Sequence, residues 1–101
     1  MAIYMTARFT VRSESVEMCQ QAIAELVDHV TRYEPETRMY ISVQEAEDET
    51  RFLNFFIFEN EDAEARHAES EALKQFNETV RPECLEPIEL TTYTLVASTE
   101  E

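Results

Sequence analysis

The sequence contains no glycine and no tryptophan. Without glycine the chain cannot form a glycine-rich phosphate-binding loop or the dinucleotide-binding fingerprint, because both need glycine backbone to approach the ligand closely. No apolar run approaches the roughly 20 residues needed to span a bilayer. The start of the chain, residues 1–5, has no basic stretch before it and is interpreted as a strand, not a signal peptide. We therefore expect a cytoplasmic protein.

Positive charge is also scarce. Eight Lys and Arg residues stand against 22 Asp and Glu, which gives a net charge of −14. Such a surface repels phosphate backbones and anionic lipids, so neither nucleic acid nor a membrane is expected as a partner. We interpret the acidic excess as a solubility surface of a kind suited to a salty interior. Steering of a cationic ligand is the alternative, and it needs a local acidic cleft that the sequence does not locate.

Length and hydrophobicity indicate one small folded domain over residues 1–101. The chain is 44% hydrophobic, and chains of this length rarely divide into two cores. A domain this small buries only about two thirds of its unfolded surface, so oligomerisation would add useful burial. The two cysteines, Cys19 and Cys84, form no close motif, and no disulfide is expected in a reducing compartment.

The hydrophobic periodicity changes along the chain between that of strands and that of helices. The predicted order is strand 2–12, helix 13–33, strand 38–45, strand 51–59, helical region 61–80 and strand 88–97. This β-α-β-β-α-β order is the split βαβ arrangement, and right-handed crossovers leave few topologies for it. The sequence therefore predicts a ferredoxin-like α+β fold, with a four-stranded antiparallel sheet and both helices on one face.

The third predicted strand is apolar on both faces. One face carries three phenylalanines and Asn54, and the other carries Leu53, Phe55 and Ile57. A strand of this kind is typical of a sheet that is covered on both sides. Because the helices cover only one face, we expect a second copy of the chain to cover the other, which makes the protein a homodimer.

Several motifs resemble those of antibiotic biosynthesis monooxygenase domains. They are Tyr33-Glu34-Pro35-Glu36-Thr37 followed by Tyr40, the run Phe52 to Phe58, the run Glu59 to Ala63, and then His67, Ser70 and Phe76. The resemblance extends over residues 2–97. It implies a dimeric α/β barrel in which two sheets pack face to face. Members of this family include cofactor-free oxygenases of quinols and polyketide aromatics, and also haem-degrading enzymes.

The resemblance implies a monooxygenase that acts without a cofactor on a small aromatic or quinol-type substrate. The sequence departs from the family at Phe56 and Phe58, where many members have Glu and Trp. The haem-degrading members rely on Trp together with Asn and His, so haem degradation is not expected. The same departures support an alternative, which is a non-catalytic dimeric ligand-binding or structural module on this fold.

Asn54 is the amide in an otherwise aromatic strand. A buried amide that lacks partners costs roughly 1–3 kcal/mol, so Asn54 must find hydrogen bonds. They are formed either with a ligand oxygen or with neighbouring protein groups, and the sequence leaves these alternatives even. Asn54 is therefore one of two candidate catalytic residues.

His67 is the other candidate, and its orientation is open. One straight helix over 61–80 would turn His67 to solvent, whereas the family pattern implies a break near Ser70 that turns it inward. An inward His67 could act as a base or donor, or it could be structural, because its reference pKa is near neutral. Its metal-like spacing with Glu64 and Glu71 arises easily by chance among 22 acids, so no metal is expected.

The candidate substrate-binding residues are aromatic. Phenylalanines of this kind are expected first as core residues, and only second as the lining of a cavity that binds a flat aromatic ligand. Tyr40 is expected at the cavity rim or the dimer interface, and His29 on a solvated flank of the first helix. The substrate-binding set is Tyr40, Phe52, Phe56, Phe58 and Phe76.

Overall fold

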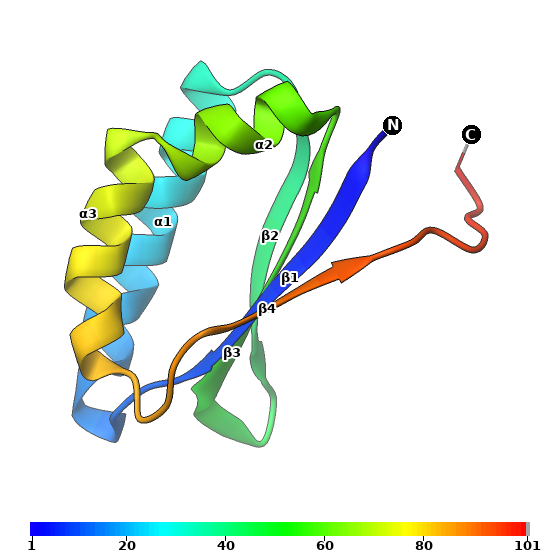
Figure 1. The fold of residues 1–101 in the computed structure, drawn as a ribbon. Coiled ribbons are helices and arrows are strands. Elements are labelled where there is room, and N and C mark those ends of the chain that lie inside the picture. The colour runs from blue at the N-terminus through cyan, green and yellow to red at the C-terminus, as the bar shows by residue number, and fades with distance from the viewer. Residues whose placement is uncertain (101) are drawn as a thin grey trace.

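The computed structural model describes residues 1–100. Its elements are β1 (Ile3–Thr10), η1 (Ser13–Ser15), α1 (Val16–Tyr33), β2 (Thr37–Glu45), β3 (Asp48–Phe58), α2 (Glu61–Ala68), α3 (Glu71–Val80), η2 (Arg81–Glu83) and β4 (Glu89–Tyr93). The strands form one antiparallel sheet in the order β2-β3-β1-β4. Both long helices lie on one face of this sheet, and α2 lies at its upper end (Figure 1). The predicted ferredoxin-like α+β fold is confirmed.

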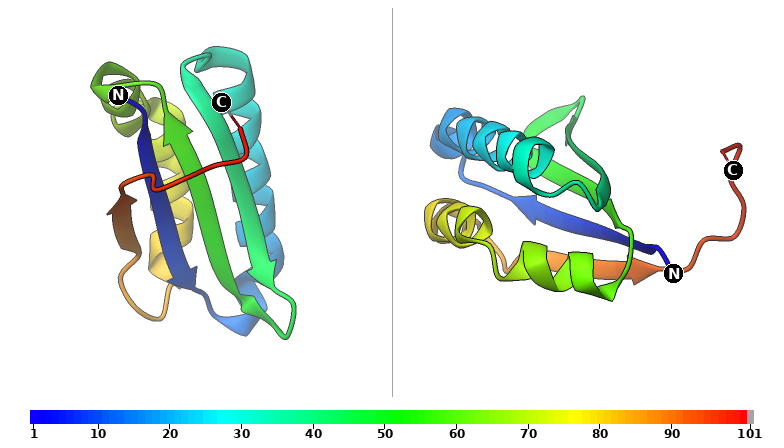
Figure 2. Two further views of the ribbon diagram at one scale, coloured as in Figure 1. Left: turned by 90° about the vertical axis from the view of Figure 1, so that its right-hand side faces the viewer. Right: turned by 90° about the horizontal axis from the view of Figure 1, so that it is seen from above.

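The last strand is shorter than predicted. It ends at Tyr93, whereas the alternation predicted a strand up to residue 97. The register explains the difference, because β4 pairs with β1 and Tyr93 lies opposite Tyr4. Continuing this register would place Val96 opposite Met1, which precedes β1. The chain after Tyr93 therefore leaves the sheet edge and passes in front of the sheet face that has no helices (Figure 2).

The helical region 61–80 is broken, as the family resemblance implied, and the straight helix is wrong. Ser70 begins α3 as its N-cap, since its Oγ accepts a hydrogen bond from the Leu73 N–H at 3.1 Å. The same hydroxyl donates to the His67 carbonyl at 2.9 Å and closes the end of α2. The break turns His67 inward, where it is 5% exposed. Within residues 1–100, no helix is long and apolar enough to cross a membrane.

The core between helices and sheet has two parts. The larger cluster joins α1 and α3 to β1 and β3, and Phe9 stacks on Phe52 in it at 5.2 Å between ring centroids. Cys19 belongs to this cluster, and burial raises the pKa of its thiol to about 11, so it is a core residue without thiolate character at neutral pH. The smaller cluster lies under α2 and contains Ala7, Phe56, Phe58 and Ala63.

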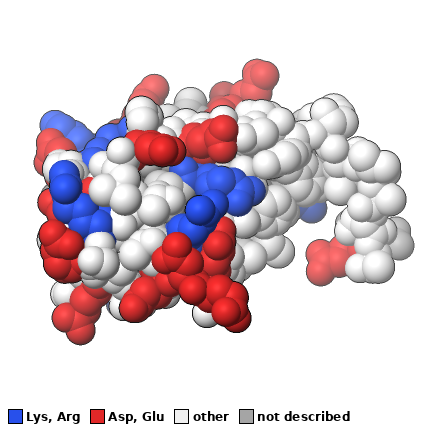
Figure 3. All heavy atoms as spheres, turned by 90° about the horizontal axis from the view of Figure 1, so that it is seen from below, with Lys and Arg blue, Asp and Glu red and all other residues white. Residues whose placement is uncertain are grey.

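The other face of the sheet is apolar and has no element of this chain packed over it. We call it the open face and define it by the side chains that β2 and β3 place there, which are Met39, Ile41, Val43, Leu53, Phe55 and Ile57. The three from β2 are between 38% and 48% exposed. Charged side chains gather instead on the side of the helices and loops, whereas the side of the open face is largely uncharged (Figure 3).

Candidate functional site

A cavity of about 180 Å³ lies between the sheet and the helices α2 and α3. Its walls are mainly aromatic and aliphatic, with a few polar groups: Met5, Ala7, Phe9, Tyr40, Asn54, Phe56, Phe58, Glu64, His67, Ala68, Leu73, Phe76, Asn77, Arg81, Ile88 and Leu90. An apolar cavity in which a few polar groups converge is the usual form of a small-molecule site. A larger hollow of about 590 Å³ lies at the β2–β3 hairpin, but exposed charged side chains such as Arg8 and Glu86 line it.

Asn54 stands at the wall of the cavity and is 1% exposed. The Ser42 hydroxyl donates to its Oδ1 at 2.5 Å, and its Nδ2 donates to the Tyr40 hydroxyl oxygen at 3.3 Å. Because Ser42 occupies the carbonyl end, the N–H end of the amide is directed toward Tyr40. One of the two N–H groups is used there, and the second has no acceptor among residues 1–100. The structure therefore shows the protein partners of Asn54, and a hydrogen bond from this amide to a ligand stays a prediction.

Tyr40 supplies a second donor beside this amide. Burial raises its pKa to about 12, against the opposing hydrogen bond from Asn54, so the phenol keeps its proton at neutral pH. Tyr40 is half-buried and lines the cavity. The ring stacks on Phe56 with centroids 4.9 Å apart and planes 8° apart, which fixes its position. The Tyr40 O–H and the free Asn54 N–H therefore form a pair of donors at the cavity wall.

Ser42→Ala is expected to destabilise the protein by about 1–3 kcal/mol, because it leaves the buried Asn54 carbonyl without its donor. The free energy of unfolding in urea measures this loss. The matched control is Ser13→Ala, which removes only an exposed 3.4 Å contact with Glu14 and should change stability by less than about 0.5 kcal/mol. Equal stability of Ser42→Ala and the wild type would contradict a stabilising role for the hydrogen bond between Ser42 and Asn54.

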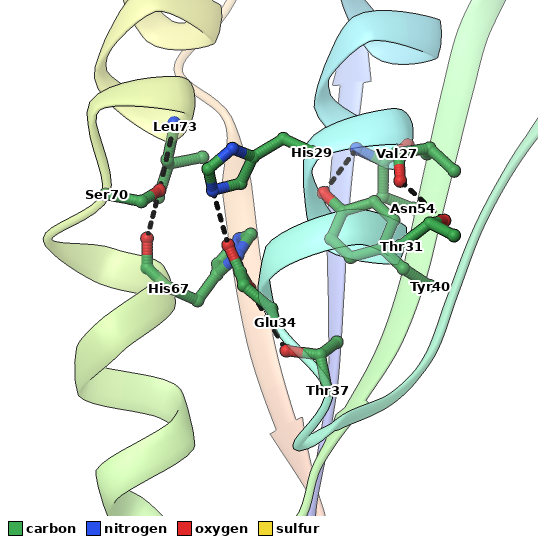
Figure 4. A network of polar contacts seen from close by, with 10 residues as sticks. All are labelled: Val27, His29, Thr31, Glu34, Thr37, Tyr40, Asn54, His67, Ser70 and Leu73. Carbon is green, nitrogen blue, oxygen red and sulfur yellow. Dashed lines mark hydrogen bonds and ion pairs between the residues drawn. The ribbon is translucent and has the colours of Figure 1, made fainter.

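His67 lies against three aromatic rings and a carboxylate. The ring centroids of Tyr40, Phe56 and Phe58 are 5.7, 6.0 and 5.3 Å away. Its Nδ1 lies 2.9 Å from Oε1 of Glu34, which comes from the end of α1 (Figure 4). An ionised carboxylate can only accept, so Nδ1 carries a proton, and in the neutral imidazole Nε2 has the lone pair. Nε2 has no hydrogen-bond partner among residues 1–100.

Glu34 is held between two histidines. Its side chain is 8% exposed, and Thr37 donates a second hydrogen bond to Oε1 at 3.1 Å. Oε2 lies 3.4 Å from Nε2 of His29, a distance that allows charge attraction, but it makes no hydrogen bond to the described residues. The prediction of a solvated His29 is wrong in this respect, since its side chain is 30% exposed and faces Glu34. The sequence analysis missed Glu34 as a site residue.

The structure brings most of the predicted site residues to one cavity. Asn54, His67, Tyr40 and the phenylalanines at 56, 58 and 76 all line it. Phe52 does not line this cavity and belongs to the larger core cluster. Glu64 lines the cavity beside His67, but Glu71 does not, and residues 1–100 hold no group of three metal-binding side chains.

These features define a ferredoxin-like α+β domain with an aromatic cavity between its sheet and its second helical region. The chain belongs to the antibiotic biosynthesis monooxygenase family, whose profile matches residues 2–79. The predicted resemblance is therefore confirmed. No curated protein matches the sequence.

Several solved structures have a fold similar to that of this chain, and some are named for the same family. One from Bacteriodes thetaiotaomicron, named for antibiotic biosynthesis monooxygenase, has a TM-score of 0.90 and 19% identity over 99% of this chain and 94% of its own. Rv0793 from Mycobacterium tuberculosis has a TM-score of 0.88 and 17% identity, over 99% of this chain and 100% of its own. The N63A mutant of SnoaB, a cofactor-independent oxygenase from Streptomyces nogalater, has a TM-score of 0.83 and 15% identity, over 99% of this chain and 98% of its own. At these identities the similarity shows the fold.

Proposed function

We propose that this protein is a cofactor-independent monooxygenase that acts on a small phenolic or quinol-type ring. The observation that carries the proposal is the His67–Glu34 pair. It leaves the second imidazole nitrogen unpartnered on a residue that lines an aromatic cavity. A histidine oriented in this way by a carboxylate is an arrangement suited to a general base. The name of SnoaB, a cofactor-independent oxygenase of the same fold, supports this chemistry.

The side chains at the cavity suit ionisation of a phenol. Nε2 of His67 accepts the hydroxyl proton, while the Tyr40 O–H and the Asn54 N–H donate to the phenolate oxygen and stabilise its charge. The electron-rich phenolate ring then reduces O₂. A carbon–oxygen bond forms on the ring, the C–H proton leaves, and the O–O bond breaks, so that one phenol and one O₂ give one quinone and one water. The phenolate supplies the electrons, so this scheme requires no cofactor.

The volume of the cavity favours a substrate with one ring. At about 180 Å³ it is close to the roughly 150 Å³ of an engineered apolar cavity that holds benzene. It is well below the roughly 300–1,000 Å³ of pockets for drug-sized ligands. A monocyclic phenol or hydroquinone therefore suits this cavity better than a fused polycyclic substrate.

We also propose that the protein acts as a homodimer joined through the open face. Proteins of this family are generally dimeric. Monomers rarely expose an apolar patch as continuous as the one that β2 and β3 form here. The segment after Tyr93 passes in front of this face, with Leu95 and Val96 50% and 96% exposed, so a second copy would also bury these side chains.

Oxygen uptake tests the enzymatic proposal. We expect consumption of O₂ with a panel of monocyclic quinols and phenols, and loss of most of that activity in the Asn54→Ala/His67→Ala double variant. Gln21→Ala on the exposed side of α1 serves as the control and should retain wild-type rates. Absence of turnover by the wild type, or undiminished turnover by the double variant, would count against the proposal.

The second candidate function is a ligand-binding module without catalysis. Phe56 and Phe58 favour it, because they fill the wall beside His67 with rings where polar chemistry could otherwise be placed. This candidate predicts that a phenol binds the cavity with no O₂ uptake, and that Asn54→Ala weakens binding. Calorimetry and an oxygen electrode on the same sample separate the two functions.

A further inference from the structure

Most of the few cations of this acidic chain are used in ion pairs. Five of the eight have a carboxylate partner, and these are Arg12, Arg32, Arg38, Arg51 and Arg66. Within residues 1–100, the other three have no carboxylate within ion-pair distance. One is Arg8, which projects from the sheet beside the open face, and the remaining two are Lys74 and Arg81. Unpaired cations are unexpected in a chain with 22 acidic residues, so their position is informative.

Arg81 lies at the edge of the cavity, and Lys74 lines the surface hollow beside it. Leu73, Asn77 and Arg81 follow one another at four-residue intervals, so α3 and the start of η2 present them along the same line, and all three line the cavity. An adjoining surface hollow of about 460 Å³ shares Asn77 and Arg81 with the cavity and is also lined by Lys74. The cavity therefore meets the surface beside two unpaired cations.

The charges around the cavity are separated. Glu64 lines it from α2, near His67, whereas Arg81 lines it from the opposite end of α3. The adjoining hollow also contains Glu69 and Glu78, which limit the charge that Lys74 contributes there. A carboxylate substituent is consequently more favourable at the Arg81 end than beside Glu64 at the α2 end. Arginine suits this task, because its planar guanidinium pairs with a carboxylate through two parallel hydrogen bonds.

We infer that the substrate is a phenol that also carries a carboxylate. This inference rests on the proposed function, because it takes the phenol hydroxyl to lie at Asn54, Tyr40 and His67. A cavity of about 180 Å³ has room for the ring alone, so a ring substituent must extend out of it, toward the adjoining surface hollow. There Arg81 pairs with the carboxylate, and Lys74 adds attraction at longer range. The arrangement selects an anionic substrate against the repulsion of a protein with net charge −14.

Two matched probes test the charge of the substrate. 4-Hydroxybenzoate carries the carboxylate, and 4-hydroxybenzamide has nearly the same shape without the charge. We expect the benzoate to bind about tenfold more tightly under anaerobic conditions, measured by calorimetry at low salt. Lys74→Gln/Arg81→Gln should remove this preference, so that the benzoate binds no more tightly than the amide. Arg32→Gln, which removes an exposed cation paired with Asp28 on α1, should keep the preference.

Each outcome of this experiment has a separate meaning. Equal affinity for the two probes, or a preference that survives Lys74→Gln/Arg81→Gln, would overturn the inference and leave the proposed function intact. Failure of both probes to bind, together with the absence of O₂ uptake across the neutral phenols, would instead refute the proposed function. Circular dichroism of the double variant verifies that it is folded, since both side chains are exposed.

Discussion

Glu34→Gln is expected to lower kcat/KM for a phenolic substrate by about 10²–10⁴-fold, the range that general-base catalysis contributes. The carboxylate accepts from Nδ1 of His67 at 2.9 Å and thereby keeps the proton off Nε2. A glutamine can present its amide N–H to Nδ1 instead. The imidazole then favours the opposite tautomer, with the proton on Nε2, and loses the lone pair that accepts the substrate proton. The proposed base is lost although the histidine is retained.

The kinetics should distinguish this effect from a change in binding. The affinity of Glu34→Gln for a phenol under anaerobic conditions should stay near the wild-type value, because Glu34 does not line the cavity. The fall should therefore lie in kcat. Glu36→Gln is the matched control, since Glu36 lies two residues away and pairs with Arg66 at the surface. A Glu34→Gln variant with wild-type kcat would refute the role of His67 as a base oriented by this carboxylate.

The fold was predictable because it rests on local periodicity. Alternation identified the strands, and Pro35 marked the end of the first helix within two residues. The length of β4 was not predictable in this way, since the apolar alternation continues to Val96. The last pair joins Tyr93 to Tyr4, one residue from the start of β1, so the length of β4 depends on the neighbouring strand. Register is non-local information that a single strand does not carry.

The site was predictable only in part, because residue type identifies some of its members but not their partners. Asn54 and His67 stand out by residue type, as the amide of an aromatic strand and the histidine of a short motif. Their partners do not stand out. Glu34 is one of 22 acids and lies 33 positions from His67, and Ser42 lies 12 positions from Asn54 on another strand. The family motif around Glu34 was the available signal, but it indicated the resemblance and not the pairing.

Phe55→Glu is expected to convert the protein from a dimer to a monomer at micromolar concentration. Phe55 stands in the middle of the open face, opposite Ile41 on β2 and Thr6 on β1. Around a twofold axis, both copies would place a carboxylate in the apolar centre of the interface. An unpaired buried charge costs about 3–5 kcal/mol, which weakens the dimer by roughly 10²–10⁴-fold. Light scattering or sedimentation velocity measures the change in mass.

The same substitution tests whether the open face is part of the interface or merely part of the core. Phe55 is only half-buried in the single chain, so a monomeric Phe55→Glu should keep its helical circular dichroism. Leu85→Glu is the control, because Leu85 is 59% exposed in the connection before β4, outside the sheet, and its replacement should leave the dimer unchanged. A wild-type protein that is monomeric at micromolar concentration would refute the dimer, and a dimeric Phe55→Glu would place the interface elsewhere. If the variant is monomeric and retains O₂ uptake, the cavity functions within one chain.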